Sequence, residues 1–482
     1  MTCRTKIVCT LGPATGTIER IGALIDAGMD VARLNFSHGT HDDHLARYRA
    51  VRRAASERDR GVAVLADLQG PKIRLGRFAA GPVLWATGEH IVITTEDCPG
   101  DHDRVSTTYK GLSADAQPGD CLLIDDGRVE LRVLAADGPD IRCEVTAGGP
   151  VSDRKGISVP DIPVSVPPLS DKDIEDLRYA LEIGVDMIAM SFVRAPEEVK
   201  LARAVMEEVG RQVPVIAKLE KPEAVRNLAA IVDAFDGLMV ARGDLGVEMR
   251  LEEVPLVQKI AIRQCVEAGK PVIVATQMLD SMATDPRPTR AEVSDVANAV
   301  LDGADAVMLS AETSVGEHAS RAVATMASIA SETERSIVPA GTETDHELTG
   351  AAIAAAAIAV GRRVGATALC CFTRTGDTAR RLALQRSPLP LIAFTPDQEV
   401  RRRLALSWGV RAVALEPTDP AAMLAELSRI LLSLGICREG DRVVVVFGAR
   451  TGVPGATDSL RVLGVHGYDL RHRRLERDPW DE

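Results

Sequence analysis

Short, almost unbroken apolar runs alternate with amphipathic segments along the first two thirds of the chain. The runs consist mainly of Val, Ile, Leu, Met and Ala, which is typical of parallel strands buried on both faces. The segments between them repeat their apolar positions at helical spacing. Eight alternating strand and helix units predict a (β/α)8 TIM barrel. The expected strands are Lys6–Thr10, Val31–Asn35, Val62–Asp67, Met187–Phe192, Pro214–Glu220, Gly237–Ala241, Pro271–Thr276 and Ala306–Ser310, and the helices include Ile18–Ala27, Asp173–Ile183, Glu197–Val209 and Pro255–Ala268.

The spacing of the runs is interrupted once, between the third and fourth strands. Short, alternating, turn-separated runs in this stretch predict an inserted all-β domain, a small β-barrel. An insertion at the carboxyl end of a barrel strand is well placed to act as a lid over an active site. We expect the TIM barrel at residues 1–70 and 167–340 and the lid at 71–166. The short runs are Val83–Trp85, His90–Thr94, Cys121–Ile124 and Val129–Val133.

A second α/β pattern begins near residue 341 and predicts a small doubly wound domain at 341–482. Its expected strands are Ala368–Thr373, Leu391–Phe394, Val410–Leu415 and Arg442–Phe447, with helices such as Thr378–Arg386 and Pro420–Leu434 between them.

The loop after the first of these strands opens a helix and carries Thr373, Thr375, Gly376 and Thr378. Hydroxyl groups, a glycine and free helix N–H groups suit a phosphate. An ordinary capped turn explains the same residues equally well. The later loop at 448–455 could close over the same ligand.

Composition and charge disfavour some classes of partner but do not identify the function. Hydrophobic residues make up 46% and charged residues 26% of the 482 residues, as in globular proteins. The net charge of -12 disfavours nucleic acid as a general partner, although a local cationic site could still bind an anionic substrate.

The nine cysteines form no C-x-x-C pair, and the adjacent Cys370 and Cys371 read as buried small hydrophobic residues. We see no signal peptide and no apolar stretch long enough to span a bilayer, so we expect a cytoplasmic protein without a membrane partner.

Polar side chains gather at the carboxyl ends of six of the expected barrel strands, the face at which barrel enzymes assemble their active sites. The other ends of the strands carry nothing comparable. These side chains are Arg33, Asn35, Ser37 and His38 after strand two, Asp67 at strand three, Lys218 and Glu220 at strand five, Arg242, Gly243 and Asp244 at strand six, Thr276 and Gln277 at strand seven, and Ser310 and Glu312 at strand eight.

The residue types at these ends suit phosphate chemistry. Glu220 and Asp244 could hold a divalent cation, most simply Mg2+, and Lys218 could neutralise a phosphoryl group in transfer. Arg33 could form two hydrogen bonds to a phosphate or carboxylate. The alternatives are a surface ion pair for Lys218 and Glu220, and a salt bridge at the barrel rim for Arg33.

The pair His41-x-x-His44 suggests a metal site, but the acidic residues between the two histidines favour a solvated helix start. No Walker A or G-x-G-x-x-G motif is present. Any phosphate site would therefore have to come from the strand ends.

Several long motifs in the chain closely resemble those of the pyruvate kinase family. The resemblance covers essentially the whole chain. Its motifs are Arg33-Leu34-Asn35-Phe36-Ser37-His38-Gly39, Ile216-Ala217-Lys218-Leu219-Glu220, Met239-Val240-Ala241-Arg242-Gly243-Asp244-Leu245-Gly246-Val247-Glu248, Ala275-Thr276-Gln277-Met278-Leu279 and Pro288-Thr289-Arg290-Ala291-Glu292-Val293-Ser294-Asp295-Val296-Ala297-Asn298.

The resemblance implies phosphoryl transfer from phosphoenolpyruvate to ADP, giving pyruvate and ATP in the last step of glycolysis, by a homotetramer. It implies that Glu220 and Asp244 hold Mg2+, with Mn2+ as a possible substitute, and that a second Mg2+ arrives with ADP. The remaining implied roles are stabilisation of the transferring phosphoryl group by Lys218, binding of the substrate carboxylate by Thr276 and the Gly243–Asp244 backbone, binding of its phosphate by Arg33, and contact with the nucleotide by His38, Arg74 and Asn35.

The chain departs from many family members after strand three. It reads Asp67-Leu68-Gln69-Gly70-Pro71-Lys72-Ile73-Arg74-Leu75, which resembles the branch that does not require K+. Asn35, Ser37, Asp67 and Leu68 would then be a vestigial site for a monovalent cation. We expect the Lys72 ammonium to replace that cation as a catalytic group, and the alternative is an outward-facing surface lysine.

Two further departures affect loops. Ala311 and Ser314-Val315-Gly316-Glu317-His318 differ from the usual sequence after strand eight, although Glu312 and Thr313 are kept. The resemblance makes the Thr373–Thr378 loop an allosteric phosphate site. Asp377 puts a negative charge there, which disfavours fructose bisphosphate and leaves AMP or a sugar monophosphate as the expected effector.

Two other functions remain open from the residues alone. A Mg2+-dependent carbon–carbon lyase acting on pyruvate-type enolates would also use Glu220, Asp244 and Arg33. It would explain the lid and Lys218 less well. A non-catalytic effector-binding protein is the other alternative, and the intact Lys218, Glu220, Asp244 and Thr276 argue against it.

Overall fold

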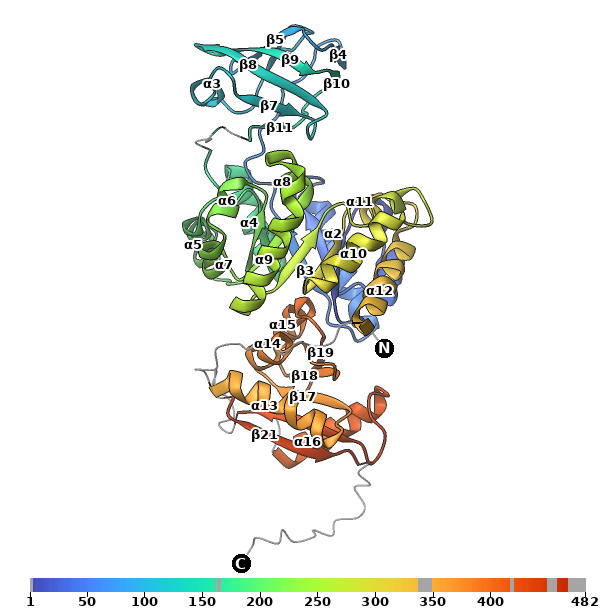
Figure 1. Ribbon diagram of the computed structural model, residues 1–482. Helices are drawn as coiled ribbons and strands as arrows, with labels where there is room; N and C mark the ends of the chain where they lie inside the picture. Colours follow the sequence, from blue (N-terminus) through green and yellow to red (C-terminus); the bar gives the residue numbers. More distant parts are fainter. Residues whose placement is uncertain are drawn as a thin grey trace, which may run out of the picture. The chain divides into compact units, whose positions relative to one another are not determined.

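The structure is a computed structural model that describes residues 3–160, 162, 166–336, 349–416, 420–448 and 457–466. The chain divides into two compact units, Met1–Ile337 and Val338–Glu482, each with its own architecture (Figure 1).

The first unit contains a closed barrel of eight parallel strands in the order β1-β16-β15-β14-β13-β12-β3-β2. This confirms the predicted TIM barrel. Nearly every strand position is buried, as expected for strands covered by helices outside and packed side chains inside. The strands are β1 (Lys6–Thr10), β2 (Val31–Asn35), β3 (Ala63–Asp67), β12 (Met187–Met190), β13 (Val215–Leu219), β14 (Gly237–Ala241), β15 (Val272–Ala275) and β16 (Ala306–Leu309).

Four of these strands end one or two residues earlier than the apolar runs predict. At two of them the backbone turns into the left-handed region within two residues of the strand end, with φ values of 53° at Phe192 and 67° at Thr276. A strand cannot continue through such a residue. The polar residues at these ends therefore lie on turns above the barrel rather than inside its strands.

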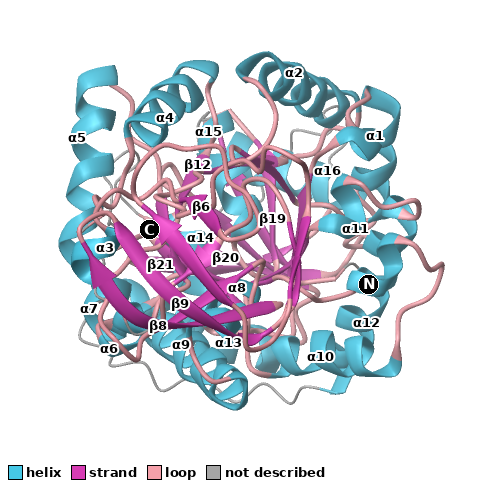
Figure 2. Ribbon diagram, turned by 90° about the horizontal axis from the view of Figure 1, so that it is seen from above, coloured by secondary structure: helices cyan, strands magenta, loops and turns pink. Residues whose placement is uncertain are grey.

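Helices surround the strands of the barrel, as Figure 2 shows. Sequence signals define several of their ends: Thr40 and Ser170 accept hydrogen bonds from the first turns of α2 and α4. Gly184 follows α4 with φ 92°, a conformation that glycine adopts readily. The helices are α1 (Ile18–Ala27), α2 (His41–Glu57), α4 (Asp171–Ile183), α5 (Val199–Val209), α6 (Pro222–Arg226), α7 (Leu228–Ala234), α8 (Arg242–Glu248), α9 (Val254–Ala268), α10 (Arg290–Leu301), α11 (Ala311–Ser314) and α12 (Ala319–Ser336), with 3-10 turns η1 (Pro13–Thr15), η2 (Pro196–Glu198), η3 (Leu251–Glu253) and η4 (Asp280–Ala283).

The described residues between β3 and α4 form an all-β segment with one short helix, as the alternating runs predict. It has its own apolar core, which includes Trp85, Leu122 and Val145. A six-stranded sheet has the order β11-β7-β8-β9-β5-β6, and β4 pairs with β10. The elements are β4 (Val83–Trp85), β5 (His90–Thr94), β6 (Arg104–Ser106), α3 (Leu112–Asp115), β7 (Cys121–Ile124), β8 (Val129–Asp137), β9 (Asp140–Ala147), β10 (Gly149–Val151) and β11 (Ile157–Ser158).

The second unit is a five-stranded sheet in the order β19-β18-β17-β20-β21, parallel except for the antiparallel edge strand β21. One face packs against α13, α14 and α15, and the other packs against α16. Helices on both faces confirm the doubly wound architecture. The elements are α13 (Thr349–Val364), β17 (Ala368–Phe372), α14 (Asp377–Leu384), β18 (Leu391–Thr395), α15 (Gln398–Arg403), η5 (Leu404–Leu406), β19 (Val410–Ala414), α16 (Pro420–Ser433), β20 (Arg442–Phe447) and β21 (Ser459–Gly464).

Cys370 and Cys371 lie on opposite faces of this sheet and are fully buried, which confirms that they serve as small core residues. All nine cysteines are free thiols. Within the described ranges, the helices are all too short or too polar to cross a lipid bilayer.

Candidate active site

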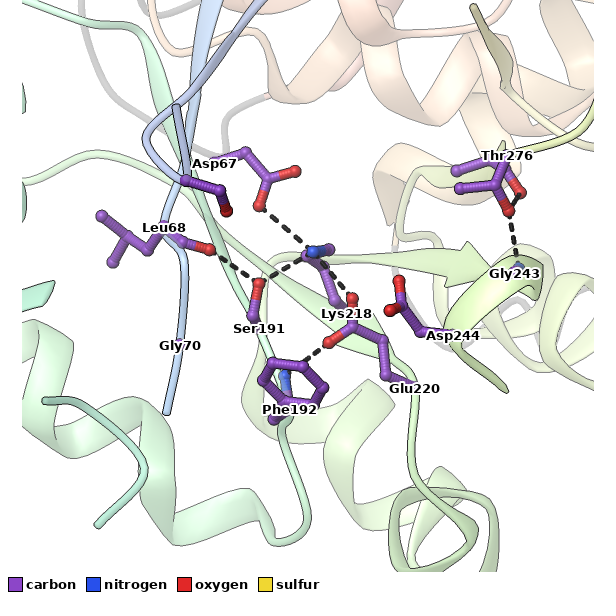
Figure 3. Close-up of polar contacts among 12 residues, drawn as sticks. Asp67, Leu68, Gly70, Ser191, Phe192, Lys218, Glu220, Gly243, Asp244 and Thr276 are labelled. Carbon is purple, nitrogen blue, oxygen red and sulfur yellow. Dashed lines mark hydrogen bonds and ion pairs between the residues drawn. The ribbon is translucent and has the colours of Figure 1, made fainter. Parts of the chain in front are cut away.

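Lys218 lies at the end of β13 and is surrounded by polar groups from three barrel strands (Figure 3). Its Nζ is 2.7 Å from Glu220 Oε1 and 3.3 Å from Asp67 Oδ1. It also donates a hydrogen bond of 2.8 Å to Ser191 Oγ. Only 11% of the lysine side chain is exposed, so the alternative of a surface ion pair is wrong.

Two opposing effects act on the protonation of Lys218. Burial disfavours the ammonium, but the charges of Asp67, Glu220 and Asp244 outweigh it and hold the pKa above its ordinary value. The lysine is therefore a fixed positive charge at any physiological pH. A group that keeps its proton can stabilise an anion but cannot act as a base.

Glu220 follows β13 directly and is held by both of its carboxylate oxygens. One oxygen contacts Lys218, and the other accepts a 2.7 Å hydrogen bond from the backbone N–H of Phe192. Burial raises the pKa of Glu220, the Lys218 ammonium opposes this effect, and the nearby Asp244 charge adds to it. The Glu220 carboxylate is thus held at a position where a bound cation would lower the free-energy cost of burying its negative charge.

Asp244 lies in the first turn of α8, just beyond β14. Its carboxylate is partly exposed, and Lys72 Nζ lies 3.9 Å from Asp244 Oδ1. In the described part of the chain, no group of three or more His, Cys, Asp or Glu side chains is arranged to hold a metal ion. The buried carboxylate of Glu220 and the partly exposed one of Asp244 together fit Mg2+, which commonly takes its other ligands from substrate and water.

Arg33 projects from β2 into a buried ion pair. Its Nε donates to Asp67 Oδ2 at 2.6 Å, and Nη1 donates to Thr10 Oγ1 at 2.9 Å. Burial opposes the Asp67 charge, but Arg33 and Lys218 together hold the Asp67 pKa below its ordinary value. The rim salt bridge thus exists, and Nη2 remains without a hydrogen-bond partner among the described residues.

The oxygens proposed for a monovalent cation are engaged with other groups. Asn35 Oδ1 accepts a hydrogen bond from Ser37 N, and Leu68 O accepts one from Ser191 Oγ. Arg33 and Lys218 contact the two oxygens of Asp67. Positive side chains already occupy the surroundings of this carboxylate.

His38 lies on the turn after β2, close enough to three cations to feel their charge. Burial lowers the pKa of His38, and the positive charges of Arg74, Arg33 and Lys72 lower it further. The Arg74 guanidinium donates to Arg154 O in the all-β segment at 3.1 Å. The convergence of these three cations on one region is suited to an anion with several charges.

Thr276 and Gly243 meet at the ends of β15 and β14. The Gly243 N–H donates a 2.7 Å hydrogen bond to Thr276 Oγ1, as Figure 3 shows. A β-carbon on residue 243 would lie 3.3 Å from the same hydroxyl oxygen. Glycine therefore permits this close approach.

A pocket lies beside Asp244, between the start and end of the all-β segment and the ends of three barrel strands. Lys221 and Glu248 form a largely buried ion pair of 2.8 Å in its wall. The lining residues are Pro71, Lys72, Ile73, Ile157, Ser158, Val166, Phe192, Arg194, Lys221, Asp244 and Glu248.

Sequence reasoning missed Ser191, Phe192 and the Lys221–Glu248 pair. Ser191 links Lys218 to Leu68 O, and the Phe192 N–H fixes Glu220. A polar residue directly after the apolar run 187–190 was the available signal for Ser191. No residue-type pattern could reveal Phe192, because its backbone performs the contact.

In α11, which follows β16, Glu312 is buried, and its carboxylate accepts hydrogen bonds from Ser310 N and Leu279 N. Burial raises the pKa of Glu312. This residue braces the loops that follow β15 and β16. It does not contact Lys218 or Glu220 in any interaction that the described residues show.

The two histidines at the start of α2 do not face one another as metal ligands. His41 Nε2 is 2.8 Å from Asp176 Oδ1, and its ring stacks on Tyr179. His44 is buried and stacks on Phe36 at 4.1 Å between ring centroids. The expectation of a solvated helix start is wrong for His44, because its ring fills the space between α2 and the end of β2.

The loop at the start of α14 in the second unit is well ordered by its own contacts. Thr373 Oγ1 accepts from Gly376 N at 2.9 Å, and Gly376 has a φ of 85°. The Thr378 hydroxyl bonds Thr457, and Arg381 pairs with Asp377 at 2.7 Å. Apart from Gly448, the second loop, at 448–455, falls outside the described residues.

Comparison with known proteins identifies the relatives of this chain. A family profile described as "Pyruvate kinase, barrel domain" matches residues 2–323, and one described as "Pyruvate kinase, alpha/beta domain" matches 351–463. A pyruvate kinase of Mycobacterium intracellulare is 58% identical over 96% of this chain and 98% of its own. The Corynebacterium glutamicum protein named pyruvate kinase is 56% identical over 98% of this chain and 99% of its own. A Staphylococcus aureus pyruvate kinase is 40% identical over 95% of this chain and 80% of its own.

Proposed function

The chain belongs to the pyruvate kinase family and is a phosphotransferase, and from this premise we propose that it carries out Mg2+-dependent phosphoryl transfer from phosphoenolpyruvate to ADP. The products are pyruvate and ATP. The observation that carries the proposal is the buried ammonium of Lys218, in contact with Glu220 and Asp67 at the carboxyl face of the barrel.

Each side chain then has a task that its surroundings support. Lys218 keeps its proton and stabilises negative charge on the transferring phosphoryl group and on the enolate that forms. Arg33 has one guanidinium nitrogen free for the substrate phosphate. Thr276 and the backbone of Gly243 and Asp244 bind the substrate carboxylate.

Glu220 and Asp244 would hold Mg2+, or Mn2+ in its place, and the ion would neutralise charge on the reacting oxygens. We assign His38, Arg74 and Asn35 to the binding of the nucleotide. The cations around His38 favour a polyphosphate there.

A coupled assay tests the reaction class. Incubation with phosphoenolpyruvate, ADP and Mg2+ should yield pyruvate, which lactate dehydrogenase and NADH report. Lys218→Met should lower kcat by about 1000-fold or more, since it removes the fixed charge in the transition state. Lys259→Met, which alters an exposed ion pair, is the matched control and should remain active.

The two alternative functions give different results in the same assay. A carbon–carbon lyase would release pyruvate from a larger enolate donor without ADP. A non-catalytic protein would show no turnover with any of these substrates. Either result from the wild-type protein, with its fold verified by circular dichroism, would contradict the proposal.

We further propose that K+ is not required. The ammonium of Lys72 near Asp244, and the engagement of Asp67 by Arg33 and Lys218, support a site that supplies its own positive charge. Activity in buffer free of Na+ and K+ should equal activity with K+ within about twofold. Lys72→Met should lower activity and make it K+-responsive, whereas Lys155→Met, which breaks a pair with Asp125, should not. A many-fold stimulation of the wild type by K+ would contradict this assignment.

The Thr373–Thr378 loop is proposed as the site of a phosphorylated effector, AMP or a sugar monophosphate. Its exposed Thr375 hydroxyl and the start of α14 support this role, and Arg381 offsets the charge of Asp377. Each effector should shift the phosphoenolpyruvate saturation curve, and Thr375→Val should weaken the shift without changing basal activity. An unresponsive wild type would favour the plain capped turn.

We propose that the chain has three domains: the catalytic barrel at 1–70 and 167–340, the lid at 71–166 and the regulatory domain at 341–482. We propose that the lid covers the pocket beside Asp244 during turnover. A cytoplasmic homotetramer completes the proposal, with phosphoenolpyruvate, nucleotide and effector as partners and no nucleic acid or membrane.

A further inference from the structure

Two consecutive non-glycine residues after β15 adopt left-handed backbone conformations. Thr276 has a φ of 67° and Gln277 a φ of 52°. This conformation is unfavourable for a β-branched residue such as threonine. It persists only where the surroundings hold it, and such strain gathers at functional sites.

Arg242, the first residue of α8, provides contacts that hold this segment. Its Nη2 donates to Thr276 O at 2.8 Å and to Gln277 O at 3.4 Å, and its Nε donates to Ala275 O at 3.4 Å. One guanidinium thus engages three successive carbonyls. A planar group with five N–H donors can do this, and an ammonium cannot reproduce its geometry.

A second residue orients the guanidinium from the other side. Asp295 of α10 accepts a 2.6 Å hydrogen bond from Arg242 Nη1. Only 12% of the arginine side chain is exposed. Asp295 lies within the long motif at 288–298, for which the candidate site otherwise offers no role.

The held segment brings two polar groups into contact. Thr276 Oγ1 donates to Ala275 O at 2.7 Å and accepts from Gly243 N at the same distance. Because Gly243 directly follows Arg242, a single arginine controls both the hydroxyl and the amide that contact each other. A shift of the segment would misplace both groups together.

We propose that Arg242, oriented by Asp295, is a positioning residue that fixes the left-handed Thr276–Gln277 segment and thereby aligns Thr276 and Gly243 for the substrate carboxylate. The alignment step rests on the proposed function. The fixing of the segment does not, because it is a property of the folded chain alone.

Hydrogen exchange measured by mass spectrometry tests the fixing of the segment without any turnover. In Arg242→Lys and in Asp295→Asn, peptides that cover 272–280 should exchange about tenfold faster or more than in the wild type. The control is Lys259→Met, which breaks the Lys259–Asp302 pair between α9 and the end of α10 and touches none of the three carbonyls. Unchanged exchange in both variants would overturn the proposal.

Steady-state kinetics test the alignment. The KM for phosphoenolpyruvate should rise about tenfold or more in both variants, while the KM for ADP stays within about twofold. Equal changes in both KM values, or unchanged kinetics despite faster exchange, would overturn the positioning role. Arg242→Ala is avoided because it removes the whole buried guanidinium. If Arg242→Lys folds poorly, Asp295→Asn still tests the proposal, because it leaves the arginine in place.

The two readouts separate this inference from the proposed function. If the wild type makes no pyruvate, the proposed function and the alignment are both overturned. Faster exchange in the variants would in that case still support the fixing of the segment by Arg242. Faster exchange with a selective rise in the phosphoenolpyruvate KM supports the inference in full.

Discussion

At the scale of single residues, the candidate site depends on how Lys218 is held. A flexible lysine would lose conformational freedom on meeting a transition state, and that loss would raise the barrier. Here Glu220 and Ser191 fix its ammonium before any substrate arrives. Ser191 also donates to Leu68 O, so it ties the lysine to the end of β3.

The change Ser191→Ala should lower kcat about tenfold while leaving the fold intact. The lysine keeps its carboxylate partners but loses the hydroxyl that sets its direction, and a buried hydrogen bond of this kind contributes about 1 kcal/mol to stability. Steady-state kinetics and a urea titration measure the two effects. Ser428→Ala, which removes a buried hydroxyl bonded to Leu424 O in α16, is the control. A Ser191→Ala enzyme with wild-type kcat would show that the serine does not orient Lys218.

At the scale of elements, the polar ends of the strands are shaped by turns rather than by the strands. Phe192 turns sharply after β12 and points its N–H at Glu220, and Thr276 turns sharply after β15. Gly70 packs closely on this turn, since a β-carbon there would lie 2.7 Å from the Phe192 ring. The barrel thus supplies a rigid frame, and the short turns above it set the directions of the functional groups.

The packing of α2 against the end of β2 makes stability depend on pH. Burial lowers the pKa of His44 to about 4, and neither ring nitrogen has a hydrogen-bond partner among the described residues. The unfolded chain binds the proton more tightly, so this contribution is present above about pH 6.5 and is lost as the pH falls toward 4.

Lowering the pH from 7 to 5 should therefore cost the wild type about 2 kcal/mol through His44 alone. In His44→Leu that part of the pH dependence should vanish, because leucine does not titrate. Urea unfolding at the two pH values measures the difference, and His90→Leu, at an exposed histidine, serves as the control. Identical pH dependence in wild type and His44→Leu would contradict a buried neutral histidine.

At the scale of the whole molecule, large aliphatic side chains are exposed on and beside one helix of the barrel unit. Leu256 and Ile260 lie one turn apart on α9, with 62% and 40% of their surfaces exposed, and the nearby Leu251 is 73% exposed. Neighbouring exposed aliphatic side chains are typical of a surface that a partner covers. These exposed side chains support the proposed oligomer.

The double change Leu256→Glu and Ile260→Glu should therefore reduce the assembly to smaller species. Light scattering coupled to size-exclusion chromatography measures the mass, and the monomer has a mass of 51.5 kDa. Like charges brought together across an interface disfavour association. Leu84→Glu, at an exposed leucine of β4, should leave the mass unchanged. A wild type of 51.5 kDa would contradict the oligomer.

The sequence by itself determined the barrel, the inserted all-β segment and the C-terminal sheet. Buried parallel strands must be almost continuously apolar, and that pattern is legible without a structure. It also gave Lys218, Glu220, Asp244 and Thr276 as a group, because parallel strands of a barrel end on one face. The apolar pattern did not reveal β21, because this edge strand carries no continuous apolar run.

Only the tertiary structure decided how those groups are oriented. Three sets of contacts join residues that are far apart in sequence. They are the hydrogen bond from Phe192 N to Glu220, the link through Ser191, and the hydrogen bonds from Arg242 to three carbonyls. All three use backbone atoms, which every residue type possesses. Local pattern records which side chains are polar and where strands end, but φ angles and long-range hydrogen bonds arise only when the strands close into a ring.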